Sequence, residues 1–168
     1  PGWTFSAAPF LEAKTVKDGN QSALAWGVRL VLQQQVGHSL YLGEYYTYTD
    51  SKAHEDVFSY REHALGAYAG YHWTPALWSE IGYQFSRGDS FRTTDASDTT
   101  GNTVHQSYGS SSQGVFKETV NTHEGKATVG YAWTEAVTTL IGYTFTESTG
   151  SLGTSRSHVG FAGVTYDF

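Results

Sequence analysis

Residues 70–86, GYHWTPALWSEIGYQFS, align without a gap with residues 130–146, GYAWTEAVTTLIGYTFT. Each copy holds two segments in which apolar and polar side chains alternate, joined by a short turn at 74–76 or 134–136. Alternation with a period of two is typical of a β-strand with one apolar face. The unit is therefore a β-hairpin, and its repetition predicts a meander or a barrel.

A partial third copy lies upstream, where residues 46–51, YTYTDS, match residues 143–148, YTFTES. Gly43 and Glu44 precede it, and we expect them to absorb a one-residue β-bulge in that strand. The alternation is also clear in residues 22–34, where one face carries Leu24, Trp26, Val28, Leu30 and Leu32.

Eight strands are expected, an even number, at residues 3–15, 22–35, 40–49, 59–73, 77–87, 119–133, 137–147 and 158–168. The connections alternate between short turns, at 37–38, 74–76 and 134–136, and longer polar loops, at 16–21, 50–58, 88–118 and 148–157. Short turns at one end and long loops at the other are typical of a transmembrane antiparallel up-and-down β-barrel. The sequence thus predicts an all-β fold.

The segment 88–118 is the longest connection and is rich in Ser, Thr, Gly and Asp. Its pieces 103–108 and 115–120 could extend the flanking strands, so we expect a protruding hairpin or a mobile loop rather than two further membrane strands. Pro9 cannot donate to a strand ladder, which predicts a bulge or a missing hydrogen bond in the first strand.

Composition restricts the protein class further. The 168 residues suit a single domain, 1–168, and hold no Cys, so disulfides and thiol chemistry are excluded. The net charge of −6 argues against nucleic-acid binding. The mean hydropathy of −0.40 is typical of a soluble protein. A transmembrane β-strand, however, needs only about 9 to 11 residues of alternating character, so its average hydropathy can also be polar. No signal peptide is seen, so we expect a mature chain.

The last segment, HVGFAGVTYDF at 158–168, ends in Phe168 with Tyr166, Val164 and Ala162 at alternate positions before it. It resembles the C-terminal assembly signal of bacterial outer-membrane β-barrels, and the meander resembles the small eight-stranded class of outer-membrane protein A's transmembrane domain, outer-membrane protein X and the opacity proteins. The resemblance implies the outer membrane of a Gram-negative bacterium, contact with its lipid and lipopolysaccharide, and recognition by the barrel-assembly machinery. A soluble lipocalin-like barrel is the alternative.

Charged residues fall on the polar face of the expected strands. An eight-stranded barrel is only wide enough for side chains to fill, and buried charges need partners. We therefore expect an interior ion-pair and hydrogen-bond network that plugs the barrel. A narrow gated channel through the same carboxylates stays open as an alternative. The residues are Glu12, Lys14, Arg29, Glu62, Glu80, Glu124 and Lys126.

Aromatic residues gather near the ends of the apolar rows. Interfacial girdles explain such positions, because amphipathic rings lie at headgroup depth; a carbohydrate-binding face is the rival interpretation. The residues are Trp3, Trp26, Tyr71, Trp73, Trp78, Tyr131, Trp133 and Tyr143.

Motifs for metal binding and catalysis are weak. The seven His residues, at 38, 54, 63, 72, 105, 123 and 158, have no metal-site spacing, so loop or interfacial positions are expected and no cofactor is predicted. The loose catalytic groupings are His105 with Ser107, and Ser157 with His158 and Glu147. An outer-membrane enzyme acting on lipid or peptide therefore remains only a further alternative.

The tetrapeptide at 87–90, Arg87, Gly88, Asp89 and Ser90, matches the integrin-recognition sequence of adhesive proteins, although a Gly-containing rim turn is the preferred interpretation. The sequence predicts a non-enzymatic outer-membrane barrel. Its loops would serve adhesion, surface protection or contact with a surface ligand or envelope partner.

Overall fold

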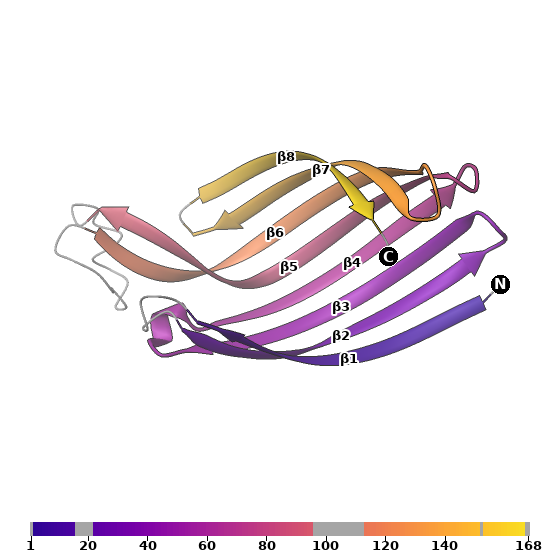
Figure 1. Ribbon diagram of the computed structural model, residues 1–168. Coiled ribbons are helices and arrows are strands. Elements are labelled where there is room, and N and C mark those ends of the chain that lie inside the picture. Colours follow the sequence, from indigo (N-terminus) through magenta and orange to yellow (C-terminus); the bar gives the residue numbers. More distant parts are fainter. Residues whose placement is uncertain (1, 16–21, 96–112, 152, 167–168) are drawn as a thin grey trace.

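The computed structural model is one antiparallel sheet of eight strands, in the order β1 to β8 (Figure 1). It describes residues 2–15, 22–95, 113–151 and 153–166. A short 3-10 turn, η2, lies between the third and fourth strands. The bounds are β1 Gly2–Lys14, β2 Ala23–Val36, β3 Leu40–Ala53, η2 Asp56–Phe58, β4 Tyr60–His72, β5 Leu77–Asp95, β6 Gln113–Ala132, β7 Val137–Gly150 and β8 Gly153–Tyr166.

Every strand pairs with its neighbours in the chain, so the eight-stranded up-and-down arrangement is confirmed. The expected bulge at Gly43 and Glu44 is wrong, because the register between β2 and β3 runs unbroken from Val36 opposite Leu40 to Ala23 opposite Ala53. Pro9 likewise lies opposite Val28 in an unbroken register. A strand at the edge of the sheet tolerates proline because one of its sides has no partner strand.

Strands extend into three of the segments expected as longer polar connections, 50–58, 88–118 and 148–157; for 88–118 a protruding hairpin or a mobile loop was expected. β5 and β6 pair as far as Asp95 opposite Gln113, and β7 and β8 pair as far as Gly150 opposite Gly153. Thr is β-branched and suits strands even where both faces are polar, so these segments extend the ladders without any apolar alternation. Residues 115–120 thus lie in β6, whereas 103–108 lie outside the described residues. The β5–β6 hairpin projects beyond the other strands (Figure 1).

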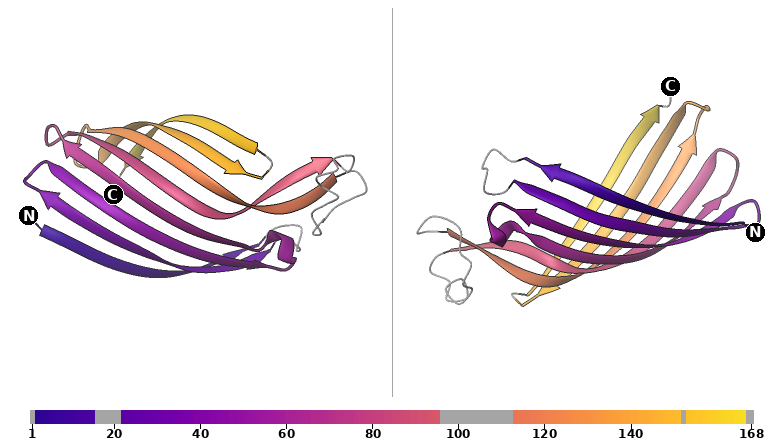
Figure 2. Two further views of the ribbon diagram at one scale, coloured as in Figure 1. Left: turned by 180° about the vertical axis from the view of Figure 1, so that it is seen from behind. Right: turned by 90° about the horizontal axis from the view of Figure 1, so that it is seen from below.

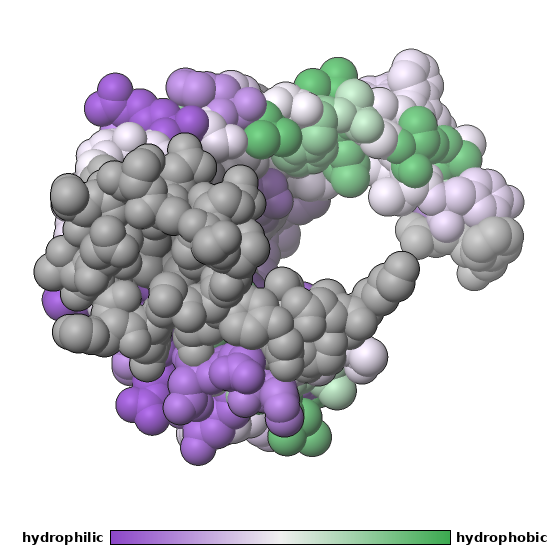
Figure 3. All heavy atoms as spheres, turned by 90° about the vertical axis from the view of Figure 1, so that its left-hand side faces the viewer, coloured by the Kyte–Doolittle hydropathy of each residue, from purple (hydrophilic) through white to green (hydrophobic). Residues whose placement is uncertain are grey.

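The sheet is strongly coiled, and β6 to β8 cross the direction of β1 to β3 (Figure 2). Seen from the loop end, the strands curve around a hollow (Figure 3). Closure into a barrel was expected, but β1 and β8 form the two edges of the sheet and no ladder joins them in the described ranges. No helix of the described chain is long and apolar enough to cross a membrane.

The two faces of the sheet differ in curvature and chemistry. On one face, side chains reach across an intervening strand: Tyr41 of β3 donates to Glu80 of β5, and Tyr45 of β3 donates to Gln84 of β5. Such contacts are possible only on a concave surface, so we name this the inner face. The opposite, outer face carries large exposed apolar side chains such as Leu65, Ile81 and Val164, which are 60%, 64% and 69% exposed.

Candidate functional site

On β4 and β6 the outward side chains change character in the same order along the strand. On β6 the outward residues run from Asn121 and His123, through Gly125, Ala127 and Val129, to Tyr131 and then Trp133 just beyond the strand. On β4 they run from Arg61 and His63 through Leu65, Ala67 and Ala69 to Tyr71, with Trp73 beyond. An apolar band therefore lies between two aromatic edges.

The edge at the short turns is built twice in the same way. Trp73 Nε1 donates to Ser79 Oγ at 2.9 Å, and Trp133 Nε1 donates to Thr139 Oγ1 at 2.9 Å. Each indole packs edge-on against a tyrosine two residues earlier, Tyr71 or Tyr131, at 4.8 and 4.7 Å between ring centroids. The repeat that was found in the sequence is thus also a repeat of side-chain contacts.

The edge at the loop end is built from three matching tyrosine–histidine pairs. In the three pairs, the tyrosine hydroxyl oxygen lies 2.7, 2.6 and 2.5 Å from histidine Nδ1. Each imidazole also contacts the aromatic ring two residues after the tyrosine, with 4.9 to 5.2 Å between the ring centroids. All three histidines are exposed. The pairs, with the second ring in third place, are Tyr46–His63–Tyr48, Tyr83–His123–Phe85 and Tyr143–His158–Phe145.

These pairs place three of the seven histidines at the border of the apolar band. The motif had a sequence signal: Tyr-x-aromatic on one strand and His on the next. This motif was missed because the register is needed to know which residues of neighbouring strands lie opposite each other. Alternation alone does not give the register.

Beyond the tyrosine–histidine pairs the outer face becomes charged. Arg61 Nε lies 3.1 Å from Asp50 Oδ2, and Arg156 Nε lies 2.5 Å from Glu147 Oε2. Arg87 is exposed and forms no ion pair with any residue that the structure describes. The order from turn end to loop end is therefore aromatic, apolar, aromatic, charged.

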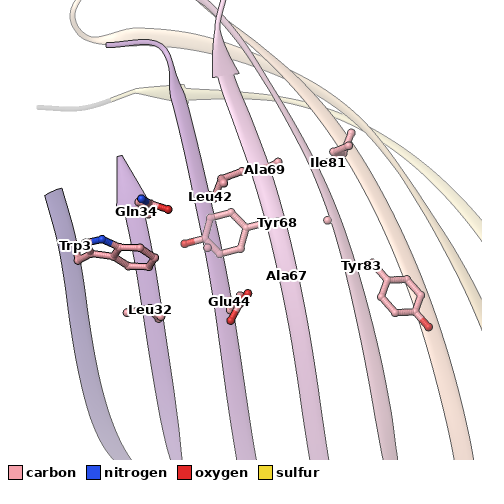
Figure 4. A pocket seen from close by; sticks show the side chains of 12 residues that line it. Trp3, Leu32, Gln34, Leu42, Glu44, Ala67, Tyr68, Ala69, Ile81 and Tyr83 are labelled. Atoms are coloured by element: carbon pink, nitrogen blue, oxygen red, sulfur yellow. The ribbon is translucent and has the colours of Figure 1, made fainter. Parts of the chain in front are cut away.

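A groove of about 550 Å³ crosses the apolar band over β1 to β5 (Figure 4). Ala67 and Ala69 of β4 form its floor because their side chains are small, while larger apolar side chains form its walls. Glu44 also lines it, because the unbroken register puts this carboxylate on the outer face. The walls include Trp3, Leu32, Leu42, Ile81 and Tyr83.

The inner face packs aromatic rings over glycines on the facing strand. A Cβ at any of these glycines would overlap the opposed ring. Each ring occupies the space that a side chain at the facing glycine would need. The rings therefore fill the narrow interior without overlapping another side chain at these positions. The directly opposed pairs are Phe10–Gly27, Tyr41–Gly70, Tyr68–Gly43, Tyr45–Gly66, Trp78–Gly130 and Phe161–Gly142.

Trp78 was expected in an outer aromatic girdle but lies on the inner face, over Gly130. The strand resumes at Leu77 after the turn, so Leu77 points outward and the next residue inward. Its equivalent in the second copy is Thr138, so nothing in the repeat required a tryptophan at this position.

The charged residues expected inside the barrel all alternate onto the inner face. Glu80 accepts the Tyr41 hydrogen bond at 3.0 Å, Arg29 lies 4.9 Å from the centroid of the Tyr45 ring, and the Lys126 ammonium lies 5.9 Å from that of Phe161. Within the described ranges, no ion pair joins two members of the set. The contacts seen are hydrogen bonds and cation–π contacts. The set is Glu12, Lys14, Arg29, Glu62, Glu80, Glu124 and Lys126.

Part of this set lines an inner cavity of about 460 Å³. Arg29, Lys126, Glu80 and Glu124 all line it, together with four tyrosines. The cavity is thus polar with both signs of charge. The tyrosines are Tyr41, Tyr45, Tyr68 and Tyr83.

The segment Arg87-Gly88-Asp89 is neither a turn nor a loop. It lies within β5 and pairs on both sides, with Gly88 opposite Glu62 on β4 and Val120 on β6. Asp89 Oδ2 accepts the Arg61 backbone N–H at 3.2 Å. The rim-turn interpretation is wrong, since paired strand backbone continues on either side of Gly88.

The catalytic grouping of Ser157 with His158 and Glu147 does not assemble. Ser157 lies on the inner face, opposite Thr146, whereas His158 and Glu147 lie on the outer face and contact Tyr143 and Arg156. His105 and Ser107 lie outside the described residues. Among the described residues, no group of three or more His, Asp or Glu side chains is placed to hold a metal ion.

The outer rows of β8 carry two residues of the expected assembly signal. Val164 and Tyr166 are exposed on the outer face, and Phe168 lies outside the described residues. Comparison with protein-family models, with curated proteins and with solved structures finds no match to this chain.

Proposed function

We propose that this protein is a non-enzymatic β-barrel of the bacterial outer membrane, which anchors a projecting hairpin and polar loops for contact with a partner outside the cell. The order of side chains along the outer face is the observation that carries the proposal. The loops supply the contact, and the strands supply the anchor.

The height of the apolar band supports a location in a membrane. His123 and Trp133 are ten residues apart on one strand, which is about 33 Å at the usual rise per residue. At the strand tilt of such barrels, this corresponds to about 25 Å along the membrane normal, which is the height of the apolar band that aromatic girdles flank. The turn-end tryptophans and the loop-end tyrosine–histidine pairs would then lie at the two interfaces.

In lipid, the unpaired backbone groups of β1 and β8 would be costly, because no water is present to bond them. We therefore expect these two strands to pair in the bilayer and to close the barrel. The rings stacked over glycines would fill the interior, so the closed barrel is plugged. The inner face would then serve stability rather than transport.

The β5–β6 hairpin is the part best placed to meet a partner. Its strands continue beyond the charged outer rows, and its base is braced by the η2 turn. Lys117 Nζ donates to the carbonyl oxygen of Ser59 at 3.2 Å, and the ring centroids of Phe58 and Phe91 are 6.0 Å apart. These contacts tie the described base of the hairpin to the segment that precedes β4.

Two arginine substitutions on one strand test the proposal. Val129→Arg places a charge within the apolar band of β6, whereas Asn121→Arg places it on the same face beyond His123. In a bilayer the first should cost about 2–4 kcal/mol and the second about 0–1 kcal/mol. Refolding into phosphatidylcholine vesicles, followed by cold against boiled gel migration, measures the folded fraction. Equal folding of both variants together with β-structure that stays soluble without detergent would contradict the membrane barrel.

The inner cavity favours a second candidate, a narrow conductance along the residues of opposite charge that line it. Planar-bilayer recording on the refolded protein tests this directly. Unitary currents that change with Glu80→Gln would support the channel, and a silent bilayer with fully folded protein would rule it out.

A further inference from the structure

The outer face around His63, beyond the groove toward the loop end, combines a hydrogen-bond donor with cations. When Nδ1 of a neutral imidazole accepts the tyrosine O–H, its proton lies on Nε2. The Nε2–H group of His63 is then free to donate, because Tyr46 engages the other nitrogen at 2.7 Å. The side chain is exposed, so this donor is accessible from outside the sheet.

Two arginines flank this donor. Arg87 lies directly opposite His63 in the register of β4 and β5, and Arg61 is the next outward residue along β4. The Arg61 side chain is 68% exposed although it contacts Asp50, so its guanidinium has further donors to offer. A phosphate oxygen is the group that such donors and charges recognise.

The groove lies in the same outward row of β4 as His63. Its floor ends at Ala67, and the exposed Leu65 lies between Ala67 and His63. The walls visible in Figure 4 combine apolar side chains from β1, β2, β3 and β5 with the polar Gln34 and Glu44. A hydrocarbon chain fits the groove while the polar end of the same molecule meets His63 and the arginines.

We propose that this surface binds one anionic lipid, with an acyl chain in the groove over Ala67 and Ala69 and its phosphate at His63, Arg61 and Arg87. The inference rests on the proposed membrane location and goes beyond it by assigning a specific lipid site. Glu44 opposes an anion from the groove wall and limits the affinity.

His123 provides an internal comparison. It makes the same contacts with Tyr83 and Phe85, but the register places Glu147 opposite it and Asn121 at the next outward position. Because no arginine lies directly opposite His123, its imidazole should bind phosphate more weakly than that of His63. The residue types around His63, rather than the imidazole alone, therefore define the site.

The charged groups on the outer face at the loop end are Glu44, Asp50 and Lys52 on β3, Arg61 on β4, Arg87 and Asp89 on β5, Lys117 on β6, Glu147 on β7 and Arg156 on β8.

Native mass spectrometry from neutral detergent micelles measures the site. The probes are phosphatidic acid, phosphatidylcholine and diacylglycerol with identical chains, and inorganic phosphate. Each arginine near a lipid phosphate is worth about 1 kcal/mol, so Arg87→Gln should weaken phosphatidic acid binding about fivefold. His63→Gln removes the imidazole donor and should also weaken it. Glu44→Gln should strengthen it.

Two histidine variants serve as controls. His123→Gln, on the same face, and His72→Gln, on the inner face of the same strand, should change binding less than about twofold. Unchanged binding in both His63→Gln and Arg87→Gln would overturn the site. Equal retention of inorganic phosphate alone would also overturn it, since the acyl chain would then contribute nothing.

The membrane location has a separate readout. Wild-type protein that folds in vesicles but shows no loss in the His63 and Arg87 variants would contradict the lipid site alone. Wild-type protein that fails to insert at all would contradict both proposals.

Discussion

Tyr45 and Gly66 are directly opposed on β3 and β4, and the Tyr45 ring lies over the glycine while its hydroxyl donates a 2.8 Å hydrogen bond to Gln84 Oε1 on β5. The glycine is what allows the ring to lie flat and reach across β4. Three neighbouring strands are therefore tied together by one side chain. Counting this pair, a ring lies over a directly facing glycine at six places among the described residues of the inner face.

A methyl group at Gly66 should break this arrangement. Gly66→Ala would overlap the Tyr45 ring and displace it, losing the contact with Gln84. Overpacking of this kind costs about 1–3 kcal/mol. Gly125→Ala is the matched control, because nothing lies within 4 Å of a Cβ there. Urea unfolding in micelles compares the two, and equal stability would show that the ring moves aside freely.

The two copies of the short turn should depend on one hydroxyl each. Thr134 Oγ1 accepts the backbone N–H groups of Ala136 and Val137 at 3.2 and 3.1 Å. Thr134→Val removes this acceptor while keeping the shape, which should lower the free energy of unfolding by about 1 kcal/mol.

Thr134→Ser keeps the hydroxyl and should stay close to wild type. Thr74→Val should reproduce the loss, since Thr74 Oγ1 accepts from Ala76 and Leu77 at 3.2 and 2.9 Å. A loss at only one of the two turns would contradict their equivalence.

The alternation of side chains predicted the strand count, the order of the strands and which residues share a face. It did so because the period of two is a property of each strand alone. It failed where the polar, β-branched ends of β5, β6, β7 and β8 form ladders without an apolar row. It also failed at Gly43, where a glycine that suggested a bulge instead lies under the Tyr68 ring.

The alternation of side chains could not predict which residues contact each other between strands. The ring–glycine pairs and the tyrosine–histidine pairs both depend on register, which a single sequence leaves open. A complementary pattern was nevertheless present: Tyr41-x-Gly43-x-Tyr45 on one strand and Gly66-x-Tyr68-x-Gly70 on the next. Antiparallel pairing of these two segments puts every ring over a glycine, so the pattern itself selects the register.

Alkaline pH should weaken the loop end of the inner face through Tyr60. Burial raises the pKa of this phenol, and the nearby carboxylates of Glu12 and Glu62 raise it further, against an opposing hydrogen bond from Ser51. The folded state therefore holds the proton more tightly than the unfolded state. This stabilisation is present below the unfolded pKa of about 10 and is lost as the pH rises through the folded value.

Tyr60→Phe has no proton to lose at this position. Its free energy of unfolding should fall less than that of wild type between pH 9 and pH 11, as measured by urea unfolding at each pH. Parallel pH profiles would show that Tyr60 has the same pKa in both states.

Pairing of β1 with β8 in a bilayer can be captured by cysteines, because the chain contains none of its own. Ala7 points outward on β1, as do Gly160, Ala162 and Val164 on β8, and the two strands run in opposite directions along the barrel wall. Ala7→Cys combined in turn with cysteine at each β8 position should form a disulfide at one of them, because bonding requires a Cα separation of about 4.4–6.8 Å. Ala7→Cys with Leu30→Cys is the positive control, since these residues are directly opposed on β1 and β2. A disulfide in the control, but in none of the β8 combinations in folded, membrane-inserted protein, would mean that the two edges remain apart and that something else covers them.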